Sequence, residues 1–576
     1  MKYFENKGFL PQNYRGLGCF DEDKVCDIFP IEPDFSDYTT FFFDAKEGDD
    51  LSDGLSENCP KKTLGEAERI LSSFDSDKGL RIRLKGKTIF AGGLKVNRKT
   101  DSKAPTVICG YGDGLPILTG TDSVLLIACS DVIVHDLEIT GRDAFRGIFV
   151  QPSFCGALKN ITIRNCYVHD INFDWYLPLP PKETSPDDVD PERVCPEYYP
   201  GTAEYYRYNR RSHGGIIFLN DTDSSVGASW FENIFILGNK VENVARTGIY
   251  VANVWADQGG VGYGRNRYVS IDESKNCPET GVGYFKNRNV VCSGNFILCA
   301  GGDGMILSSV KHVFSEHNVC YYANYLGRTG YWNAGLWVFD AEEAWLRHNE
   351  AAFTYMRHNS NDAQGFDIDN ACRKVVFKHN YAHHNEGGGL LVCNNKTAVI
   401  EHDCEGNPLH LENGMPVKTT MTGRWYDNLV CGNLFVNNGN PRDRTRSAFI
   451  TVARETDWLF AYGNVVVLSG KNSGQSIIHT EDRSQKCYHH YYAENIFYCD
   501  RETSGEFTVD MMEDSVFDGN VYFQVGDSEA FLKFDPNMKT ELPAFFDKET
   551  LYGFLTLRNL SESFDFSRKI ELNIKK

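Results

Sequence analysis

A short pattern recurs along this chain of 576 residues: a polar or glycine residue, then Asn, then apolar or aromatic residues. Two sets of copies share a spacing of 31 residues: Asn318, Asn349 and Asn380, and then Asn433, Asn464 and Asn495. Asn295 precedes the first set by 23 residues, and Asn520 follows the second by 25. Periods of about 20 to 50 residues are typical of solenoids, propellers and arrays. The chain is therefore expected to be a stack of similar units.

A second register has the same period: a glycine that opens a short apolar strand. It occurs at Gly147, Gly215, Gly248, Gly304, Gly335, Gly365 and Gly389. Two registers with one period mean that each repeat holds at least two strands joined by tight turns. Strands of about 3 to 10 residues bounded by Gly and Asn are too short for helical repeats. One rung cannot bury its apolar face alone, so rungs stack about 4.8 Å apart, and we predict an all-β fold, a parallel β-helix.

The repeated asparagines are expected to face the interior. Stacked identical amides hydrogen-bond from strand to strand, so they predict an internal ladder and no catalytic role.

The chain divides into an irregular arm over residues 1–40, a β-helix over 41–525 and a C-terminal cap over 526–576. Three long insertions interrupt the β-helix at about 172–212, 253–286 and 394–424, and the first two are rich in Trp and Tyr. Loops of this length are usually functional or disordered, and their aromatic content argues against disorder. Loops that leave one side of a solenoid are expected to wall a groove.

A helix is expected near the start of the β-helix. Thr63 followed by Glu66 forms a capping box, and the apolar residues after it fall on one helical face: Leu64, Ala67, Ile70 and Leu71. Such a helix would cover the open end of the solenoid, where the first rung exposes its core.

The net charge of the chain limits the classes of molecule it is expected to bind. The formal net charge of −20 and a pI near 5.3 argue against nucleic acid and anionic membranes. No run reaches the roughly 18 apolar residues of a membrane span, and the residues after Met1 do not form the apolar run expected of a secretory signal.

Cysteines such as Cys292, Cys299, Cys320, Cys393 and Cys431 lie in strand patterns, where a thiol acts as a small apolar side chain. A reduced, cytoplasmic protein is expected, a secreted one stays open if a leader was removed, and the oligomeric state is open.

The segment Asp44 to Asp50, followed by Gly54, Pro60 and Lys62-Thr63-Leu64, resembles the opening segment of right-handed parallel β-helix carbohydrate-active enzymes, the pectate-lyase-like superfamily. The resemblance covers most of the chain as architecture and implies a right-handed parallel β-helix. Members include glycoside hydrolases, polysaccharide lyases, epimerases and non-catalytic binders, so the fold alone does not choose among them.

Three carboxylates lie in one rung: Asp362, Asp367 and Asp369. Side chains alternate across a strand, so if Phe366 and Ile368 point inward, Asp367 and Asp369 point outward with Cα atoms about 6.5 to 7 Å apart. Like charges on one face allow one carboxyl to stay protonated while its neighbour is charged. Asp362 precedes the bend and approaches from the side.

Six further residues are expected around these carboxylates as substrate contacts: Trp337, Asp303, Asp340, His384, Glu386 and Arg246. Alignment on the shared glycine places Trp337 beside Asp367, where an indole can serve as a platform for a sugar ring. Turn aspartates also commonly bond local backbone N–H groups, clustered carboxylates also suit calcium, and Arg246 also suits an ion pair. His383 and His384 are adjacent and expected to diverge, which favours polar lining over a shared metal.

The leading hypothesis is a glycoside hydrolase that acts on a neutral or lightly charged oligosaccharide without a cofactor. Asp362 would be the acid, and Asp369 or Asp367 the nucleophile or base. A polysaccharide lyase or uronate epimerase is the second hypothesis, and it needs Ca²⁺ or a cationic side chain. A non-catalytic glycan-binding solenoid is the third.

Overall fold

The protein is described from a computed structural model of the whole chain. The described residues are 22–74, 77–98, 104–172, 212–220, 227–255, 273–281, 283–325, 333–356, 362–394, 398–400, 403, 405, 407–420, 425–439, 447–468, 476–480, 487–499, 515–523, 532 and 535–543.

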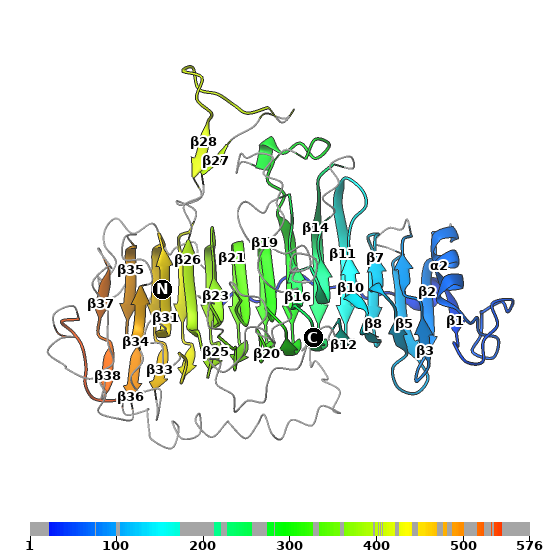
Figure 1. The fold of residues 1–576 in the computed structure, drawn as a ribbon, viewed down its shortest axis with the longest axis horizontal. Helices are drawn as coiled ribbons and strands as arrows, with labels where there is room; N and C mark the ends of the chain where they lie inside the picture. The colour runs from blue at the N-terminus through cyan, green and yellow to red at the C-terminus, as the bar shows by residue number, and fades with distance from the viewer. Residues whose placement is uncertain are drawn as a thin grey trace, which may run out of the picture.

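The chain winds into a three-sided parallel β-helix, which confirms the predicted all-β solenoid (Figure 1). Its strands form three outer faces. Face 1 contains β4 (Leu94–Val96), β7 (Asp122–Ile127), β10 (Ala144–Val150), β13 (Gly214–Phe218), β16 (Thr247–Val251), the first parts of β19 (Met305–Glu316) and β21 (Leu336–Arg347), β23 (Gln364–Ile368), β26 (Gly388–Asn394), β31 (Ser447–Arg454) and β34 (Ser476–Thr480).

Face 2 follows face 1 along the chain and completes the larger, 23-stranded sheet. It contains β1 (Tyr38–Phe43), β2 (Gly79–Lys85), β5 (Thr106–Tyr111), β8 (Val132–His135), β11 (Gly156–Arg164), β14 (Ser229–Leu237), β17 (Asn287–Ser293), the second parts of β19 and β21, β24 (Arg373–Lys378), β29 (Asn428–Cys431), β32 (Asp457–Tyr462), β35 (Tyr488–Ala493) and β37 (Val516–Asp518).

Face 3 is a separate sheet of 13 strands. It contains β3 (Ile89–Ala91), β6 (Ile117–Thr119), β9 (Glu138–Gly141), β12 (Tyr167–Ile171), β15 (Lys240–Val244), β18 (Phe296–Ala300), β20 (Val319–Tyr321), β22 (Glu350–Ala352), β25 (Tyr381–His383), β30 (Leu434–Val436), β33 (Val465–Leu468), β36 (Ile496–Cys499) and β38 (Val521–Phe523). All pairings within the three faces are parallel, whereas β27 (Ala398–Ile400) and β28 (Lys418–Thr420) form an antiparallel hairpin outside them.

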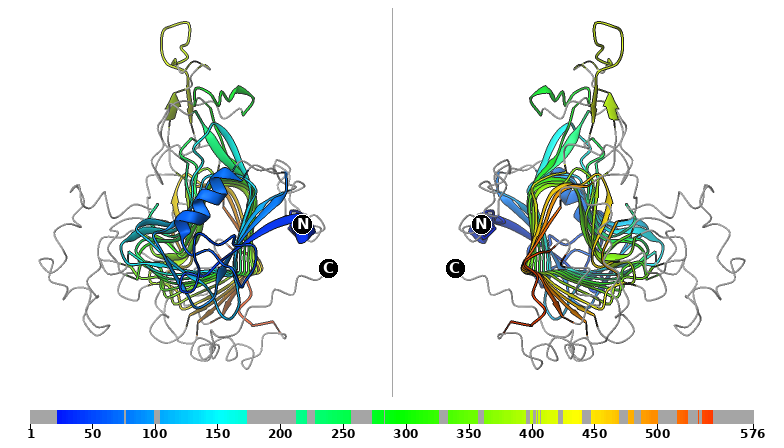
Figure 2. Two further views of the ribbon diagram at one scale, coloured as in Figure 1. Left: turned by 90° about the vertical axis from the view of Figure 1, so that its right-hand side faces the viewer. Right: turned by 90° about the vertical axis from the view of Figure 1, so that its left-hand side faces the viewer.

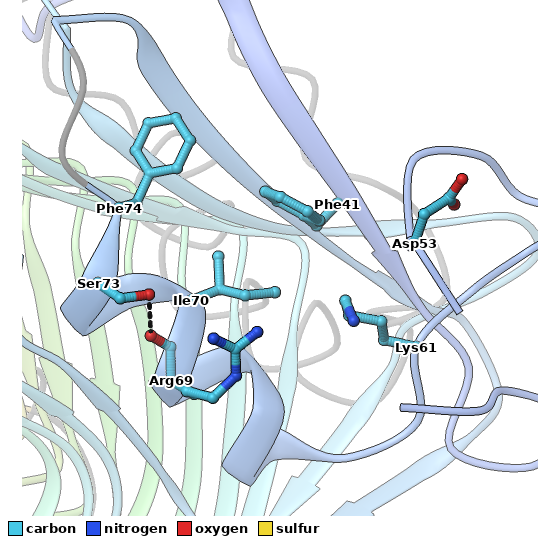
Figure 3. A pocket seen from close by; sticks show the side chains of 7 residues that line it. All are labelled: Phe41, Asp53, Lys61, Arg69, Ile70, Ser73 and Phe74. Carbon is cyan, nitrogen blue, oxygen red and sulfur yellow. Dashed lines mark hydrogen bonds between the residues drawn. The ribbon is translucent and has the colours of Figure 1, made fainter. Parts of the chain in front are cut away.

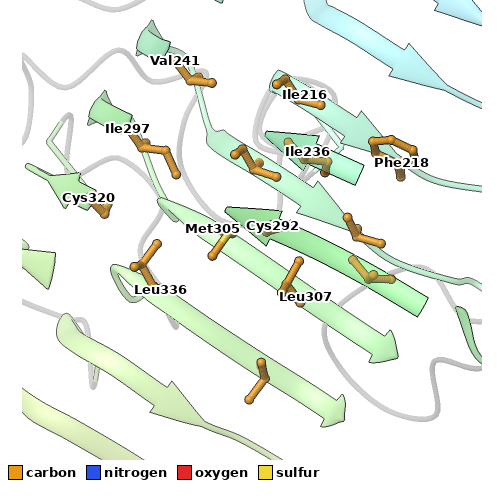
Figure 4. Close-up of a cluster of buried hydrophobic side chains, with 14 of the residues drawn as sticks. Ile216, Phe218, Ile236, Val241, Cys292, Ile297, Met305, Leu307, Cys320 and Leu336 are labelled. Atoms are coloured by element: carbon orange, nitrogen blue, oxygen red, sulfur yellow. The ribbon is translucent and has the colours of Figure 1, made fainter. Parts of the chain in front are cut away.

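One continuous core fills the solenoid. Alternate residues of each strand point into it, as Ile216, Met305 and Leu336 do on strands β13, β19 and β21 of face 1 (Figure 4). Cys292 and Cys320 are fully buried in this core, as expected, and burial raises the pKa of both thiols well above its ordinary value. Cys299 differs, because it is only partly buried.

The repeated asparagines form the predicted ladder on the inside of the corner between faces 2 and 3. Each side-chain Nδ2 donates to the Oδ1 of the next rung at 2.9–3.1 Å, in this order: Asn239, Asn295, Asn318, Asn349, Asn380, Asn433, Asn464, Asn495 and Asn520. The ladder ends at Asp535, whose carboxylate accepts from the Nδ2 of Asn520 at 2.8 Å.

The glycine register marks the corner between faces 3 and 1. A Cβ on Gly215 would lie 2.6 Å from the carbonyl oxygen of Gly248, and a Cβ on Gly147 would lie 2.8 Å from that of Gly215. The same collision with the next rung recurs at Gly248, Gly304 and Gly335. Glycine is required here because the rungs stack at backbone contact distance.

The first rung is covered by α2 (Leu64–Ser73), which lies across the end of the solenoid (Figure 2). Thr63 caps it as predicted, accepting from the backbone N–H of Glu66. The residues predicted to form its apolar face are those it buries: Leu64, Ala67, Ile70 and Leu71. None of the helices in the described parts of the chain is long and apolar enough to cross a membrane.

Residues 22–34 run along the outside of face 2 in the direction opposite to the stacking of the rungs. Asp23 pairs with Lys378 at 2.6 Å, and Glu32 pairs with Arg164 at 2.5 Å. Between these contacts, Cys26 packs against an outer apolar cluster of face 2. This segment therefore covers apolar side chains that the solenoid does not bury itself.

Candidate functional site

The carboxylates predicted for one rung lie on and around β23. Phe366 and Ile368 are buried in the core, and Asp367 between them points outward, as the alternation of the sequence predicted. Asp367 pairs in register with Trp337 on one side and Leu391 on the other, which confirms the alignment on the shared glycine. Its side chain is 5% exposed, so it lies under cover on the outer side of face 1.

Asp369 and Asp362 lie beyond the two ends of β23. Asp369 follows the strand and is partly exposed, and its Oδ1 accepts from the backbone N–H of Asn370 at 2.6 Å. Asp362 precedes the strand and is 9% exposed. The structure thus brings all three predicted carboxylates to one rung, one in the strand and one just outside each end.

The turn after β23 is held from two sides. The indole N–H of Trp425 donates to the carbonyl of Ile368 at 3.1 Å, and the backbone N–H of Asp340 donates to the carbonyl of Asn370 at 2.7 Å. Trp425 is fully buried and is 57 residues from Ile368 in the chain. Sequence reasoning did not select it, because a contact this distant has no local signal.

Asp303 is buried and accepts hydrogen bonds from three groups, so it is not exposed for contact with a substrate in this structure. It is 0% exposed, its Oδ2 accepts from Arg246 Nη1 at 2.6 Å, and its Oδ1 accepts from the indole of Trp337 at 2.9 Å and the backbone of Ala334 at 3.1 Å. The ion-pair alternative for Arg246 is therefore what the structure shows.

Trp337 lies outside the core, as predicted, but does not offer an open ring. It is 3% exposed and belongs to an outer cluster of face 1 that includes Ile306 and Phe339. The expectation of an accessible platform is not met in this structure, because neighbouring apolar side chains cover the ring. A substrate contact through Trp337 stays a prediction.

Asp340 lies at the bend of β21 between faces 1 and 2, where it is 1% exposed. It accepts from the hydroxyl of Tyr284 and pairs with Lys286 at 3.2 Å. Lys286 and Arg373 also pair with Glu342. Burial alone would raise the pKa of the Glu342 carboxyl, but these cations lower it below its ordinary value. Asp340 thus belongs to a buried charge network in this structure, and a substrate contact through it stays a prediction.

Glu386 is level with Asp362 on the following rung, as predicted, and its Oε2 accepts from the backbone N–H of Met356 at 2.7 Å. His384 is partly exposed at the end of β25. The expectation that His383 and His384 diverge is wrong, since their Nδ1 atoms lie 3.0 Å apart. The positive φ of 53° at His384 turns its side chain back toward its neighbour.

Two insertions rise on the same side of the solenoid, at the corner between faces 1 and 2 (Figure 1). One leads from β16 to β17 and includes η6 (Glu273–Lys275); the other leads from β26 to β29 and carries the β27–β28 hairpin. β23 lies between them in the stack. The expected groove wall stays a prediction, because residues 173–211 and 256–272 lie outside the described residues.

A cavity of about 340 Å³ lies at the N-terminal end, away from these carboxylates. It is lined by Phe41, Asp53, Lys61, Arg69, Ile70, Ser73 and Phe74, between α2 and β1 (Figure 3). Among the residues that the structure describes, no group of three or more His, Cys, Asp or Glu side chains is arranged to hold a metal ion.

Comparisons with known proteins support the fold. No family model matches the chain. A lacto-N-biosidase of Bifidobacterium longum subsp. longum is 22% identical over 431 residues, which span 62% of this chain but only 25% of that protein. A GH136 lacto-N-biosidase from Eubacterium ramulus superposes with a TM-score of 0.51 and 18% identity, over 77% of this chain and 65% of that one.

Proposed function

We propose that this chain is a glycoside hydrolase that acts on an oligosaccharide. The observation that carries the proposal is the placement of three carboxylates on one rung, Asp367 on the outer side of β23 and Asp362 and Asp369 just beyond its two ends. Hydrolysis of a glycosidic bond uses two carboxyl groups that flank the bond. Similarity to lacto-N-biosidases over 62% of the chain supports the same class of reaction.

We assign the acid role to Asp362 and the role of nucleophile or base to Asp369. The two carboxyl groups of a glycoside hydrolase flank the bond from different sides, and Asp362 and Asp369 lie beyond opposite ends of β23. Asp369 is more exposed, which suits a group that is charged at the start. Asp367 is the alternative for the second role, because it shares the outer side of β23.

The first substrate to test is an aryl lacto-N-bioside, because both relatives are lacto-N-biosidases. A panel of other aryl glycosides and neutral oligosaccharides would follow. Asp362→Asn and Asp369→Asn are each expected to lower kcat by about 10²–10⁴-fold, as expected for loss of an acid or base. Asp113→Asn is the control, since that carboxylate is exposed in the turn between β5 and β6.

The proposal fails if Asp362→Asn, Asp367→Asn and Asp369→Asn all keep full activity on a substrate that the wild type cleaves.

The lyase hypothesis has less support, because a lyase needs a cation to neutralise the carboxylate of a uronate substrate. Among the residues that the structure describes near β23, Arg246, Lys286 and Arg373 are ion-paired with Asp303, Asp340 or Glu342. A product with ultraviolet absorbance from an unsaturated sugar would favour the lyase.

A further inference from the structure

A stack of aromatic rings lies at the corner between faces 3 and 1, where the chain enters β21, β23 and β26. Tyr322, Phe353 and His384 occupy equivalent positions, directly after β20, β22 and β25. The ring centroids of Tyr322 and Phe353 lie 5.1 Å apart, and those of Phe353 and His384 lie 5.6 Å apart, with interplanar angles of 18° and 27°. We call these three residues the corner stack.

The backbone makes Tyr322 and Phe353 unexpected at this position. Their φ is 59°, in the left-handed region, which Asn, Asp and His enter far more readily than other bulky residues. Polar residues with φ of 50–52° take the equivalent position on other rungs: Asp170, Asn243 and Asn437. The two aromatic residues before β21 and β23 therefore go against the local backbone preference, as residues at functional sites often do.

The rings at this corner are accessible. Every member of the corner stack is partly exposed, and so are Tyr325 and Tyr355 beside it. The ring centroid of Tyr355 lies 6.0 Å from that of Tyr322 and 5.9 Å from that of Tyr325. A pyranose presents an apolar C–H face that can lie on an aromatic ring, and its hydroxyl groups can bond to phenol and imidazole groups.

Glu386 connects these rings to Asp362. Its Oε2 accepts from the backbone N–H of Met356, the residue after Tyr355, at 2.7 Å. The next residue, Gly387, lies against Asp362, because a Cβ built on it would be 2.4 Å from the carbonyl oxygen of that aspartate. The partly exposed rings therefore lie at the end of β23 where Asp362 is.

We propose that the corner stack, together with Tyr325 and Tyr355, binds a sugar ring of the oligosaccharide on the leaving-group side of the bond that is cleaved. The side follows from the acid role of Asp362, since a general acid protonates the oxygen of the leaving group. This inference rests on the proposed function. It adds an accessible aromatic platform, which Trp337 does not offer in this structure.

Phe353→Asn tests the platform, because it installs the residue that Asn243 and Asn437 provide elsewhere on this corner. The change is expected to alter Tm little, since Asn favours the left-handed backbone and offsets part of the lost ring packing. It is expected to weaken binding of a tetrasaccharide, lacto-N-biose linked to lactose, by about 10-fold. Calorimetry in an Asp369→Asn background, which is expected to prevent hydrolysis, gives the affinity.

Two further variants serve as controls. Phe353→Tyr keeps the ring and should bind the tetrasaccharide as the Asp369→Asn background does. Tyr167→Asn removes a partly exposed ring from the outer side of β12, several rungs before β22, and should also leave the affinity unchanged. A structural role of Phe353 would lower Tm in Phe353→Asn and leave the affinity of the folded protein unchanged, which would overturn the inference.

Lacto-N-biose alone identifies the side of the bond. Phe353→Asn is expected to bind this disaccharide as the background does, since it lacks the leaving-group sugars. Equal loss of affinity for both sugars would overturn the leaving-group assignment, and a background that binds neither sugar would overturn the inference as a whole. Because the readout is binding, absence of hydrolysis by the wild type counts against the proposed function alone.

Discussion

At the scale of single residues, the charges near face 1 are matched one by one. Arg246 and Asp303 form a pair with side chains 4% and 0% exposed, and Asp340 is matched by Lys286 and Tyr284. Burial of an ion pair contributes little net stability, whereas removal of one partner leaves an uncompensated charge. These pairs therefore fix geometry around β23.

Replacement of one partner of the Arg246–Asp303 pair tests this structural role. Asp303→Leu is expected to destabilise the protein by about 3–5 kcal/mol, because it leaves the Arg246 guanidinium buried without its counter-charge. The measurement is the urea midpoint of unfolding. Adding Arg246→Met to Asp303→Leu should recover part of the loss, and Asp113→Asn at the surface should change stability by less than about 0.5 kcal/mol. An unchanged midpoint for Asp303→Leu would show that the pair has no structural role.

At the scale of elements, the corner between faces 3 and 1 depends on its glycines. Successive rungs are in backbone contact here, and most of these glycines lie within a residue of the start of a face 1 strand. The position of β23, and with it that of Asp367, is set by this stacking. The sequence predicted the register, but the reason for glycine became visible only in the stacked rungs.

Gly335→Ala tests this role of the corner. Its Cβ would collide with the carbonyl oxygen of Gly365, so the change is expected to destabilise the protein by about 1–3 kcal/mol or more. Gly65→Ala is the matched control, since the nearest atom to its Cβ, Thr63 Oγ1, lies 3.8 Å away and alanine favours a helix by about 1 kcal/mol. Thermal unfolding of both variants gives the comparison, and equal Tm values would refute the steric argument.

At the scale of the whole molecule, two histidines, one buried and one partly exposed, relate stability to pH. Burial lowers the pKa of His490 in β35 to about 3. For His135 at the end of β8, burial opposes the change, but the Asp136 carboxylate at 2.8 Å raises the pKa to about 9. Both differ from the ordinary value of about 6.5, one in each direction.

The two shifts predict a stability maximum near pH 6.5. Below that value His490 is protonated in the unfolded chain but stays neutral in the folded protein. The free energy of unfolding therefore falls as the pH is lowered from about 6.5 toward about 3. His135 contributes stability that is present below about 6.5 and is lost as the pH rises toward about 9. Each contributes at most roughly 1.4 kcal/mol per pH unit.

Urea unfolding across this pH range checks the expectation. His490→Gln should flatten the acid side of the profile and His135→Gln the alkaline side. His410→Gln, at an exposed position, should leave both sides unchanged. A profile that keeps its acid slope in His490→Gln would contradict the assignment.

The sequence by itself determined the solenoid, the Asn ladder, the capping helix and the outward direction of Asp367. These features depend on alternation within a strand and on the repeat spacing, both of which are local. Only the tertiary structure decided that Asp340 and Trp337 are covered and that Trp425 holds the turn after β23. Such contacts join residues from different rungs and insertions, and their side-chain packing has no periodic signal in the chain.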